Sequence, residues 1–244
     1  LTGGTLTLAG TTPTITPTIG ISTISSVIAG TAGFTKGGAG ALTLSGANTF
    51  TGDVNVIAGT FGITSDAALG AAGNSVTLAS GTAFSVSGTL AASRNITLTG
   101  TSTVQLRGGN SGAAHYTGTG GVAAFSGVTM SNATSDYIGR TVFAGGGTYA
   151  FSSIADLGFA SALGAPTNDV DGLILVQDGG GLGGTLNYTG GASTSNRDWQ
   201  FANTSSGGTV LKNAGTGTLT LTGDIASVNA WLPSMSFQAL SGDM

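Results

Sequence analysis

A repeat with a spacing of 20 residues limits what this chain can fold into more than any other feature. Residues 76–88 read VTLASGTAFSVSG and residues 96–108 read ITLTGTSTVQLRG, so Val76 matches Ile96 and Phe84 matches Val104. Each copy holds two short segments of alternating apolar and polar residues, joined by a small polar turn. A repeat of this length in strand-like sequence is typical of a solenoid whose coils stack on one another.

Pairs of apolar residues separated by one other residue recur through the first half of the chain. They are Leu42/Leu44, Val54/Val56, Phe61/Ile63, Val76/Leu78, Phe84/Val86, Ile96/Leu98 and Val104/Leu106. Taking every second pair gives coils of 19 to 23 residues. The chain is therefore predicted to hold about 10 to 12 coils, stacked into one rod on the order of 50 Å long.

The motif G-x-L-T-L-x-G occurs at residues 4–10, 40–46 and 217–223. In a strand, its two leucines point to one side and the threonine between them to the other. Similar pairs elsewhere extend the same pattern. The residues expected to point inward in stacked ladders are Leu42, Leu44, Val76, Leu78, Ile96, Leu98, Leu219 and Leu221.

Composition supports an all-β fold. Of 244 residues, 45 are glycine, only 16 are charged and none is glutamate. Residues that favour helices are scarce, while threonine, valine and isoleucine favour strands. A hydrophobic content of 40% and a mean hydropathy of +0.33 oppose disorder. We expect a right-handed parallel β-helix (a β-solenoid), a single segment over residues 1–244, with almost no α-helix.

Several classes of protein are disfavoured by what the sequence lacks. Without cysteine there is neither a disulfide framework nor a thiolate metal site. The six cations are scattered, whereas a nucleic-acid-binding protein gathers them on one face. No run of 18 apolar residues is present, so no transmembrane segment is expected.

The two ends of the chain differ from its middle. Pro13 and Pro17 lie in a threonine-rich stretch that suits an edge or an extended segment. Residues 1–20 are therefore a candidate linking arm to a neighbouring module, or else an irregular first coil. Residues 225–244 are a candidate cap or docking end. A start at Leu1 rather than methionine indicates a processed product or an excerpt of something longer.

One stretch resembles a known family. Residues 21–52 read ISTISSVIAGTAGFTKGGAGALTLSGANTFTG and are followed by VNVIAGTF at 54–61. This sequence is similar to the autotransporter-associated β-strand repeat, and residues 210–223 give a second match. Phe34, Phe61 and Ala41 are minor departures from that pattern. The resemblance implies a right-handed parallel β-helix, exported to or beyond the outer surface of a Gram-negative-type bacterium, and it carries no catalytic residues.

Acidic residues are the first candidates for chemistry. Asp169 and Asp171 would share one side of a strand and offer oxygens to Ca²⁺, but an Asn/Asp/Gly turn that begins at Asn168 is the favoured interpretation. A second set is spaced by 20, 22 and 20 residues and would line one edge of the rod. It consists of Asp136, Asp156, Asp178 and Asp198. Repeated turns also favour aspartate for structural reasons, so no catalytic, cofactor-binding or metal-binding residue is assigned.

Histidine and aromatic residues are the remaining candidates. His115 is the only histidine, in a glycine-rich stretch read as a solvated turn, and a hydrolase would need it close to a carboxylate and a nucleophile. A ligand-binding adhesin would expose aromatic rings to stack on sugars. The rings considered for this role are Tyr116, Tyr137, Tyr149 and Trp199, although single aromatics in coils are usually core residues.

The predicted function is therefore a structural or adhesive β-helical module outside the bacterial cell. It would belong to a giant exported surface protein or form the repeating unit of a fibre or filament. Its partners would be neighbouring repeats, other copies joined end to end, or surface glycans. The alternative is a polysaccharide-binding or polysaccharide-degrading β-helix, a glycan lyase or hydrolase with converging carboxylates in a groove.

Overall fold

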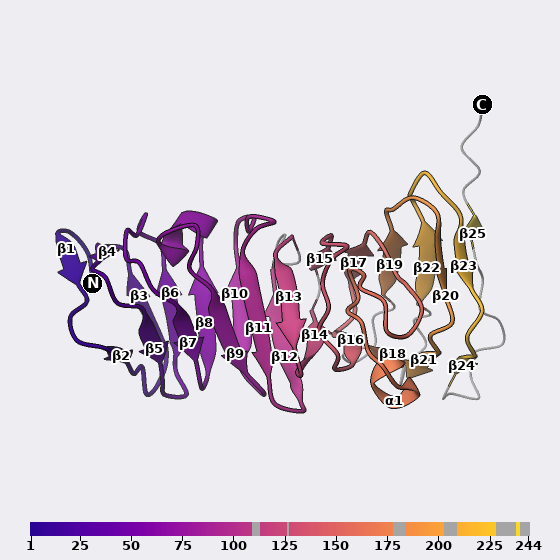
Figure 1. Ribbon diagram of the computed structural model, residues 1–244, viewed down its shortest axis with the longest axis horizontal. Helices are drawn as coiled ribbons and strands as arrows, with labels where there is room; N and C mark the ends of the chain where they lie inside the picture. Colours follow the sequence, from indigo (N-terminus) through magenta and orange to yellow (C-terminus); the bar gives the residue numbers. More distant parts are fainter. Residues whose placement is uncertain (109–112, 126, 178–183, 203–208, 228–237, 240–244) are drawn as a thin grey trace.

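The computed structural model describes residues 1–108, 113–125, 127–177, 184–202, 209–227 and 238–239. Figure 1 shows a rod with the N-terminus at one end and short strands that lie across its long axis. Every strand pairing in the described residues is parallel. The predicted all-β solenoid is therefore confirmed.

A ten-stranded sheet runs along the rod. Its strands, in spatial order, are β3 (Ile21–Ile24), β6 (Ala41–Leu44), β8 (Thr60–Ile63), β10 (Ala83–Val86), β12 (Thr103–Arg107), β14 (Gly121–Ala124), β16 (Thr141–Ala144), β18 (Ile174–Gln177), β21 (Trp199–Ala202) and β24 (Ile225–Ser227). Neighbours in this sheet are one coil apart in the sequence. Ten strands correspond to nine turns of the chain from the first to the last.

Two shorter sheets form other sides of the rod: strands of the six-stranded sheet come directly before those of the ten-stranded sheet in the chain, and strands of the five-stranded sheet come directly after them. The six-stranded sheet contains β2 (Thr14–Ile15), β5 (Phe34–Lys36), β7 (Val54–Val56), β9 (Val76–Ala79), β11 (Asn95–Thr99) and β13 (His115–Gly118). The five-stranded sheet contains β15 (Thr129–Met130), β17 (Thr148–Phe151), β19 (Thr185–Tyr188), β22 (Val210–Asn213) and β25 (Gln238–Ala239). Two pairs complete the strands, β1 (Thr5–Thr7) with β4 (Val27–Ala29) and β20 (Ser193–Ser195) with β23 (Leu219–Leu221).

Helical structure is limited to two single turns in the described residues. One is the 3₁₀ turn η1 (Asp66–Leu69), and the other is α1 (Asp169–Gly172), which Figure 1 shows at the side of the rod. Few residues here favour helices, and each turn belongs to a connection between strands. The expectation of almost no helix is confirmed.

With the coil of residues 1–20 before them, the nine turns between β3 and β24 lie at the lower end of the 10 to 12 coils expected. Early coils are short, as the pairing of Ile21 with Ala41 shows. Later coils are longer, because Thr141 pairs with Ile174 and Ile174 pairs with Trp199. The longest coil carries an excursion that includes α1. Connections can lengthen at little cost in loop entropy, so spacing measured in the regular part overestimates the number of coils.

The core consists of stacked apolar ladders. Leu42, Val76 and Leu98 are fully buried, and so are the other predicted core residues of the first half. The prediction is confirmed there but is only partly right at the far end. Leu219 and Leu221 lie in β23, which pairs only with β20 in the described residues. Both leucines are half-buried and pack against the core.

Strand register corrects the repeat in one place. Val76 pairs with Ile96 as expected, but Phe84 pairs with Leu106 rather than Val104. The second copy has a turn that is two residues longer, and the Ser80 hydroxyl fills it by bonding to Thr99 O and to both main-chain groups of Ser102. A shift of two residues keeps every side chain on its own face, so the core is unaffected.

Residues 1–20 form a coil in register with their own chain. Thr5 pairs with Val27 and Thr14 pairs with Thr35, while the amino group of Leu1 donates to Thr23 O at 2.8 Å. An arm exchanged between modules stays a prediction. Of residues 225–244, the structure describes β24, which is the last strand of the ten-stranded sheet, and β25. The cap or docking end also stays a prediction, since the remainder of that range lies outside the described residues.

Candidate functional site

The outer surface of the six-stranded sheet carries two columns of polar side chains, which we call the polar face. One column is Thr14, Thr35, Asn55, Thr77, Thr97 and Thr117, which pair from strand to strand. The other column lies two residues earlier in each coil and consists of Asp53, Ser75, Asn95 and His115, with Asp136 beside His115 in the following coil. Residues between the columns, such as Val54 and Ile96, are fully buried. Alternation along each strand therefore separates core from polar face.

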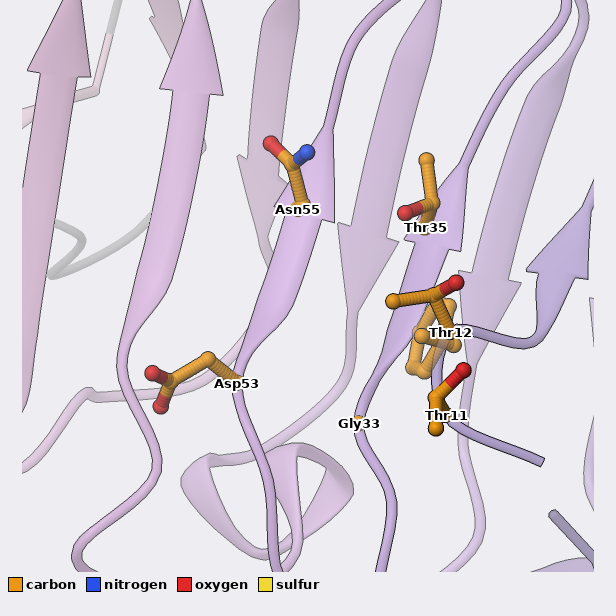
Figure 2. A pocket seen from close by; sticks show the side chains of 7 residues that line it. Thr11, Thr12, Gly33, Thr35, Asp53 and Asn55 are labelled. Carbon is orange, nitrogen blue, oxygen red and sulfur yellow. The ribbon is translucent and has the colours of Figure 1, made fainter. Parts of the chain in front are cut away.

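A shallow hollow of about 240 Å³ lies at the N-terminal end of the polar face. It is lined by Thr11, Thr12, Gly33, Phe34, Thr35, Asp53 and Asn55. Figure 2 shows Asp53 and Asn55 projecting from the chain of β7, with Thr35 on the neighbouring strand and Thr11 and Thr12 on the segment before β2. The three threonines lie on one side of β7, while the carboxylate of Asp53 is directed to the other side, toward the next coil. The hollow is thus lined largely by hydroxyl and amide side chains, which suits a ligand rich in hydroxyl groups.

The carboxylate of Asp53 is held in place by the next coil. Its Oδ1 accepts a hydrogen bond from Ser75 N–H at 2.7 Å. Asp53 and Asn55 are both exposed, while Thr35 is half-buried. The hollow therefore presents fixed polar atoms to solvent on a rigid sheet, an arrangement that favours recognition of a ligand over catalysis.

At the opposite end of the polar face the structure brings together two residues from the sequence analysis, His115 and Asp136. His115 begins strand β13 rather than lying in a turn, because its main-chain N–H donates to Arg94 O in the preceding coil. Its Nδ1 lies 3.1 Å from Asn95 Oδ1, and its Nε2 lies 3.4 Å from Asp136 Oδ1. The ring thus has the carboxylate that a hydrolase needs, but neither partner supplies the hydroxyl of a hydrolytic triad.

The acidic row does not converge on one site. Asp156 Oδ1 accepts from Asn196 N–H at 2.8 Å, and Asp198 Oδ1 accepts from Asp224 N–H at 2.8 Å. Each of these carboxylates satisfies a backbone donor of another coil, and Asp136 instead faces His115. Asp178 lies outside the described residues. The regular spacing is explained for Asp156 and Asp198 by bonds between coils.

Asp169 and Asp171 do not share one side of a strand as expected, because they belong to the helical turn α1. Asn168 caps that turn by accepting from Asp171 N–H at 3.0 Å, and its Nδ2 donates to the Asp171 carboxylate at 2.9 Å. This is the Asn/Asp turn that the sequence favoured. Nowhere in the described ranges do three or more histidine or acidic side chains gather as a metal centre.

The aromatic candidates belong to the core. Tyr116 and Tyr137 are fully buried, and Tyr149 and Trp199 are 2% and 1% exposed. Burial raises the pKa of Tyr137 to about 12 although its hydroxyl bonds to Thr141, so the phenol stays protonated at neutral pH. A surface for stacking sugars on these four rings is therefore excluded.

Three of the six cations are buried, which the sequence did not reveal. Lys36 Nζ donates to the carbonyls of Gly38, Gly40 and Ala58 at 2.6–2.8 Å, and burial lowers its pKa. A Cβ added at Gly59 would lie 2.6 Å from that Nζ, and its φ of +70° also favours glycine. Glycine at position 59 thus leaves room in the next coil for the buried ammonium group of Lys36.

The two buried arginines also bridge coils. Arg94 donates to Asp66 with Nη2–Oδ2 at 2.7 Å and to the carbonyls of Ala71 and Asn74 at 2.8 Å. Arg197 donates to the carbonyls of Gly172 and Leu163, and burial lowers its pKa to about 10, so it remains charged at neutral pH. These cations support the fold and are not available to bind a partner.

Comparison with known proteins gives two matches. Residues 34–63 match the passenger-associated-transport-repeat family, inside the stretch where the resemblance was drawn. Over 225 residues the chain is 48% identical to the "Adhesin BmaC autotransporter" of Brucella suis biovar 1 (strain 1330). The aligned region is 92% of this chain and 6% of the relative. The chain thus spans a small fraction of that relative's length. No solved structure matches it.

These matches confirm the predicted family resemblance and indicate an extracellular or cell-surface protein. In the part of the chain that the structure describes, no helix is long and apolar enough to cross a membrane.

Proposed function

The chain carries a passenger-associated transport repeat within a β-solenoid, and from this premise we propose that it is a rigid adhesive module of a large exported surface protein. The observation that carries the proposal is the 48% identity to an autotransporter adhesin over nearly the whole chain. In this role the solenoid acts as a spacer of fixed shape, and the polar face presents hydroxyl, amide and carboxylate groups to the host or to neighbouring cells.

Several physical features support the polar face as the contact surface. Its side chains are held at the spacing of parallel strands, about 4.8 Å per coil. Short threonine and asparagine side chains on a sheet lose little rotamer entropy on binding compared with lysine or glutamate. A partner would therefore meet a preorganised array of donors and acceptors, which favours affinity.

Adhesion of coated beads tests this function. Beads that carry the chain should bind an epithelial monolayer, and the double variant Asn55→Glu/Thr97→Glu should bind several-fold less because it charges the polar face. The matched control is Thr43→Glu/Ser85→Glu, which places the same charges two coils apart on the outer side of the ten-stranded sheet. Binding no better than that of albumin-coated beads, or equal losses in both variants, would contradict the proposal.

Polysaccharide binding is the second candidate, and the hollow at Asp53 and Asn55 favours it. Of the residues that line it, Asp53 is the only acid, whereas glycoside hydrolysis uses a pair of carboxyl groups. The proposal is therefore binding without turnover.

Retention on immobilised neutral polysaccharide tests this second function. Asp53→Ala should reduce retention, while Asp169→Ala/Asp171→Ala should leave it unchanged. No reducing ends should be released from polygalacturonate or alginate, with or without Ca²⁺. Release that disappears in the Asp169→Ala/Asp171→Ala variant would establish an enzyme instead.

A further inference from the structure

The contacts of His115 leave one of its ring nitrogens facing a carboxylate without a normal hydrogen bond. Nδ1 lies 3.1 Å from Asn95 Oδ1, and in the neutral tautomer with the proton on Nδ1 the ring donates to this oxygen. Nε2 then holds a lone pair. It lies 3.4 Å from Asp136 Oδ1, beyond the usual 2.7–3.2 Å of an N–H···O bond.

The separation of these two atoms matches the edge of a metal tetrahedron. With Zn–N and Zn–O lengths near 2.0–2.2 Å and a tetrahedral angle, the nitrogen and oxygen ligands lie roughly 3.4 Å apart. We propose that His115 Nε2 and Asp136 Oδ1 bind one divalent ion of the zinc type at the C-terminal end of the polar face.

The surroundings of the pair are consistent with an open site. The side chains of His115 and Asp136 are 27% and 51% exposed, so water or a ligand from outside can complete the coordination. Asn95 acts as the outer partner that orients the ring and sets its tautomer, as is usual for metal-bound histidine. An imidazole–carboxylate pair selects zinc-type ions over Ca²⁺, which takes six or more oxygen ligands.

The strands fix this geometry before any ion binds. Asn95 and His115 are paired residues of β11 and β13, and Asp136 N–H donates to Tyr116 O. Three successive coils thus each contribute one side chain to the row. The proposal is independent of adhesion, since it is measured on the purified chain alone.

Calorimetric titration with zinc chloride near neutral pH tests the proposal, on the complete chain without a histidine tag. We expect one ion per chain and weaker binding at acid pH, because the proton competes for Nε2. His115→Gln and Asp136→Asn should each weaken binding at least about tenfold, and Asn95→Ala about 10- to 100-fold. Zinc should also raise the melting temperature of the parent chain, since it binds the folded state.

The matched control is Asp198→Asn, which removes a carboxylate of the same kind whose partner is a main-chain N–H. It should bind zinc like the parent. The proposal is overturned if the parent shows no saturable binding up to a zinc concentration on the order of 1 mM. It is also overturned if His115→Gln binds as tightly as the parent while its circular dichroism shows a folded chain. Competition by excess Ca²⁺ would likewise contradict the selectivity.

Discussion

Arg94 shows how one residue can link several coils. Its guanidinium is 1% exposed and bonds to Asp66 in η1 and to two carbonyls of the connection that follows. Backbone carbonyls at a corner of a solenoid have no strand partner, so an arginine fork that reaches several of them replaces the missing ladder.

Replacing Arg94 with methionine should lower the free energy of unfolding by about 3 kcal/mol, since it removes the charged partner of a partly buried carboxylate and the guanidinium bonds to two carbonyls. The value lies at the low end for a broken buried ion pair because the Asp66 side chain remains 26% exposed. Urea unfolding followed by circular dichroism measures it. Arg107→Met, at an exposed arginine over the Phe125 ring, should cost less than about 1 kcal/mol. Equal losses of unfolding free energy in both variants would show that Arg94 does not stabilise this corner of the solenoid.

Asp66 gives the fold an acid-sensitive component. Burial raises the pKa of this carboxyl, but hydrogen bonds from Arg94 and Ala91 N–H and the charge of Arg94 outweigh burial and hold it below its ordinary value of 3.8. Because the folded-state pKa is the lower one, the unfolded chain binds more protons in acid. The stabilisation is complete above the ordinary value and is lost as the pH falls through the folded-state value.

Accordingly, Asp66→Asn should be less stable than the parent at about pH 7, and the difference should shrink below about pH 4. Melting temperatures recorded across that range measure the effect. Asp169→Asn, at an exposed carboxylate on α1, should follow the parent at every pH. A gap between parent and Asp66→Asn that stays constant into strong acid would contradict the assigned sign.

At the scale of the element, each strand has one face toward the core and one toward solvent, and neighbouring residues lie on opposite faces. In β11, Leu98 is fully buried and pairs with Leu78, while Thr97 pairs with Thr77 and Thr117 on the polar face. A shift by one residue would exchange these faces, whereas the two-residue difference between β10 and β12 does not. The side of the strand on which a residue lies is therefore specified more strictly than the number of residues in each coil.

Leu98→Asp should destabilise the chain by several kcal/mol, because it places an unpaired charge in the core. Thr97→Asp, one residue away, should cost less than about 1 kcal/mol, since that side chain faces solvent. Thermal melting of the two variants beside the parent checks the register. The assignment is wrong if Leu98→Asp melts with the parent or if Thr97→Asp loses as much.

At the scale of the whole molecule, a stack of coils ends in unpaired strands. At the N-terminal end, β1, β2 and β3 each pair with one strand in the described residues, β4, β5 and β6. Such edges can add a further strand by main-chain hydrogen bonds. End-to-end association of modules is a proposal that rests on these edges and on the predicted linking role of residues 1–20.

Deletion of residues 1–20 should abolish end-to-end association if this segment is the linking arm, while the circular dichroism of the β-solenoid stays largely intact. Negative-stain imaging and light scattering of the parent and truncated chains provide the measurement. Assemblies of normal length from the truncated chain would exclude the arm and leave direct stacking of coils. If the parent is monodisperse at all concentrations, self-association of the isolated chain is excluded.

The sequence by itself determined the fold class, the inward residues of the first half and the family resemblance. Alternation of period two and repetition of about 20 residues are local properties, so Leu42, Val76 and Ile96 could be placed inward without knowing their neighbours. Only the tertiary structure decided which coils meet. The structure pairs Phe84 with Leu106 and shows that Lys36, Arg94 and Arg197 are buried. It also shows that Asn95, His115 and Asp136 lie side by side on the polar face. These outcomes depend on turn lengths and on contacts between coils, which no single stretch of sequence contains.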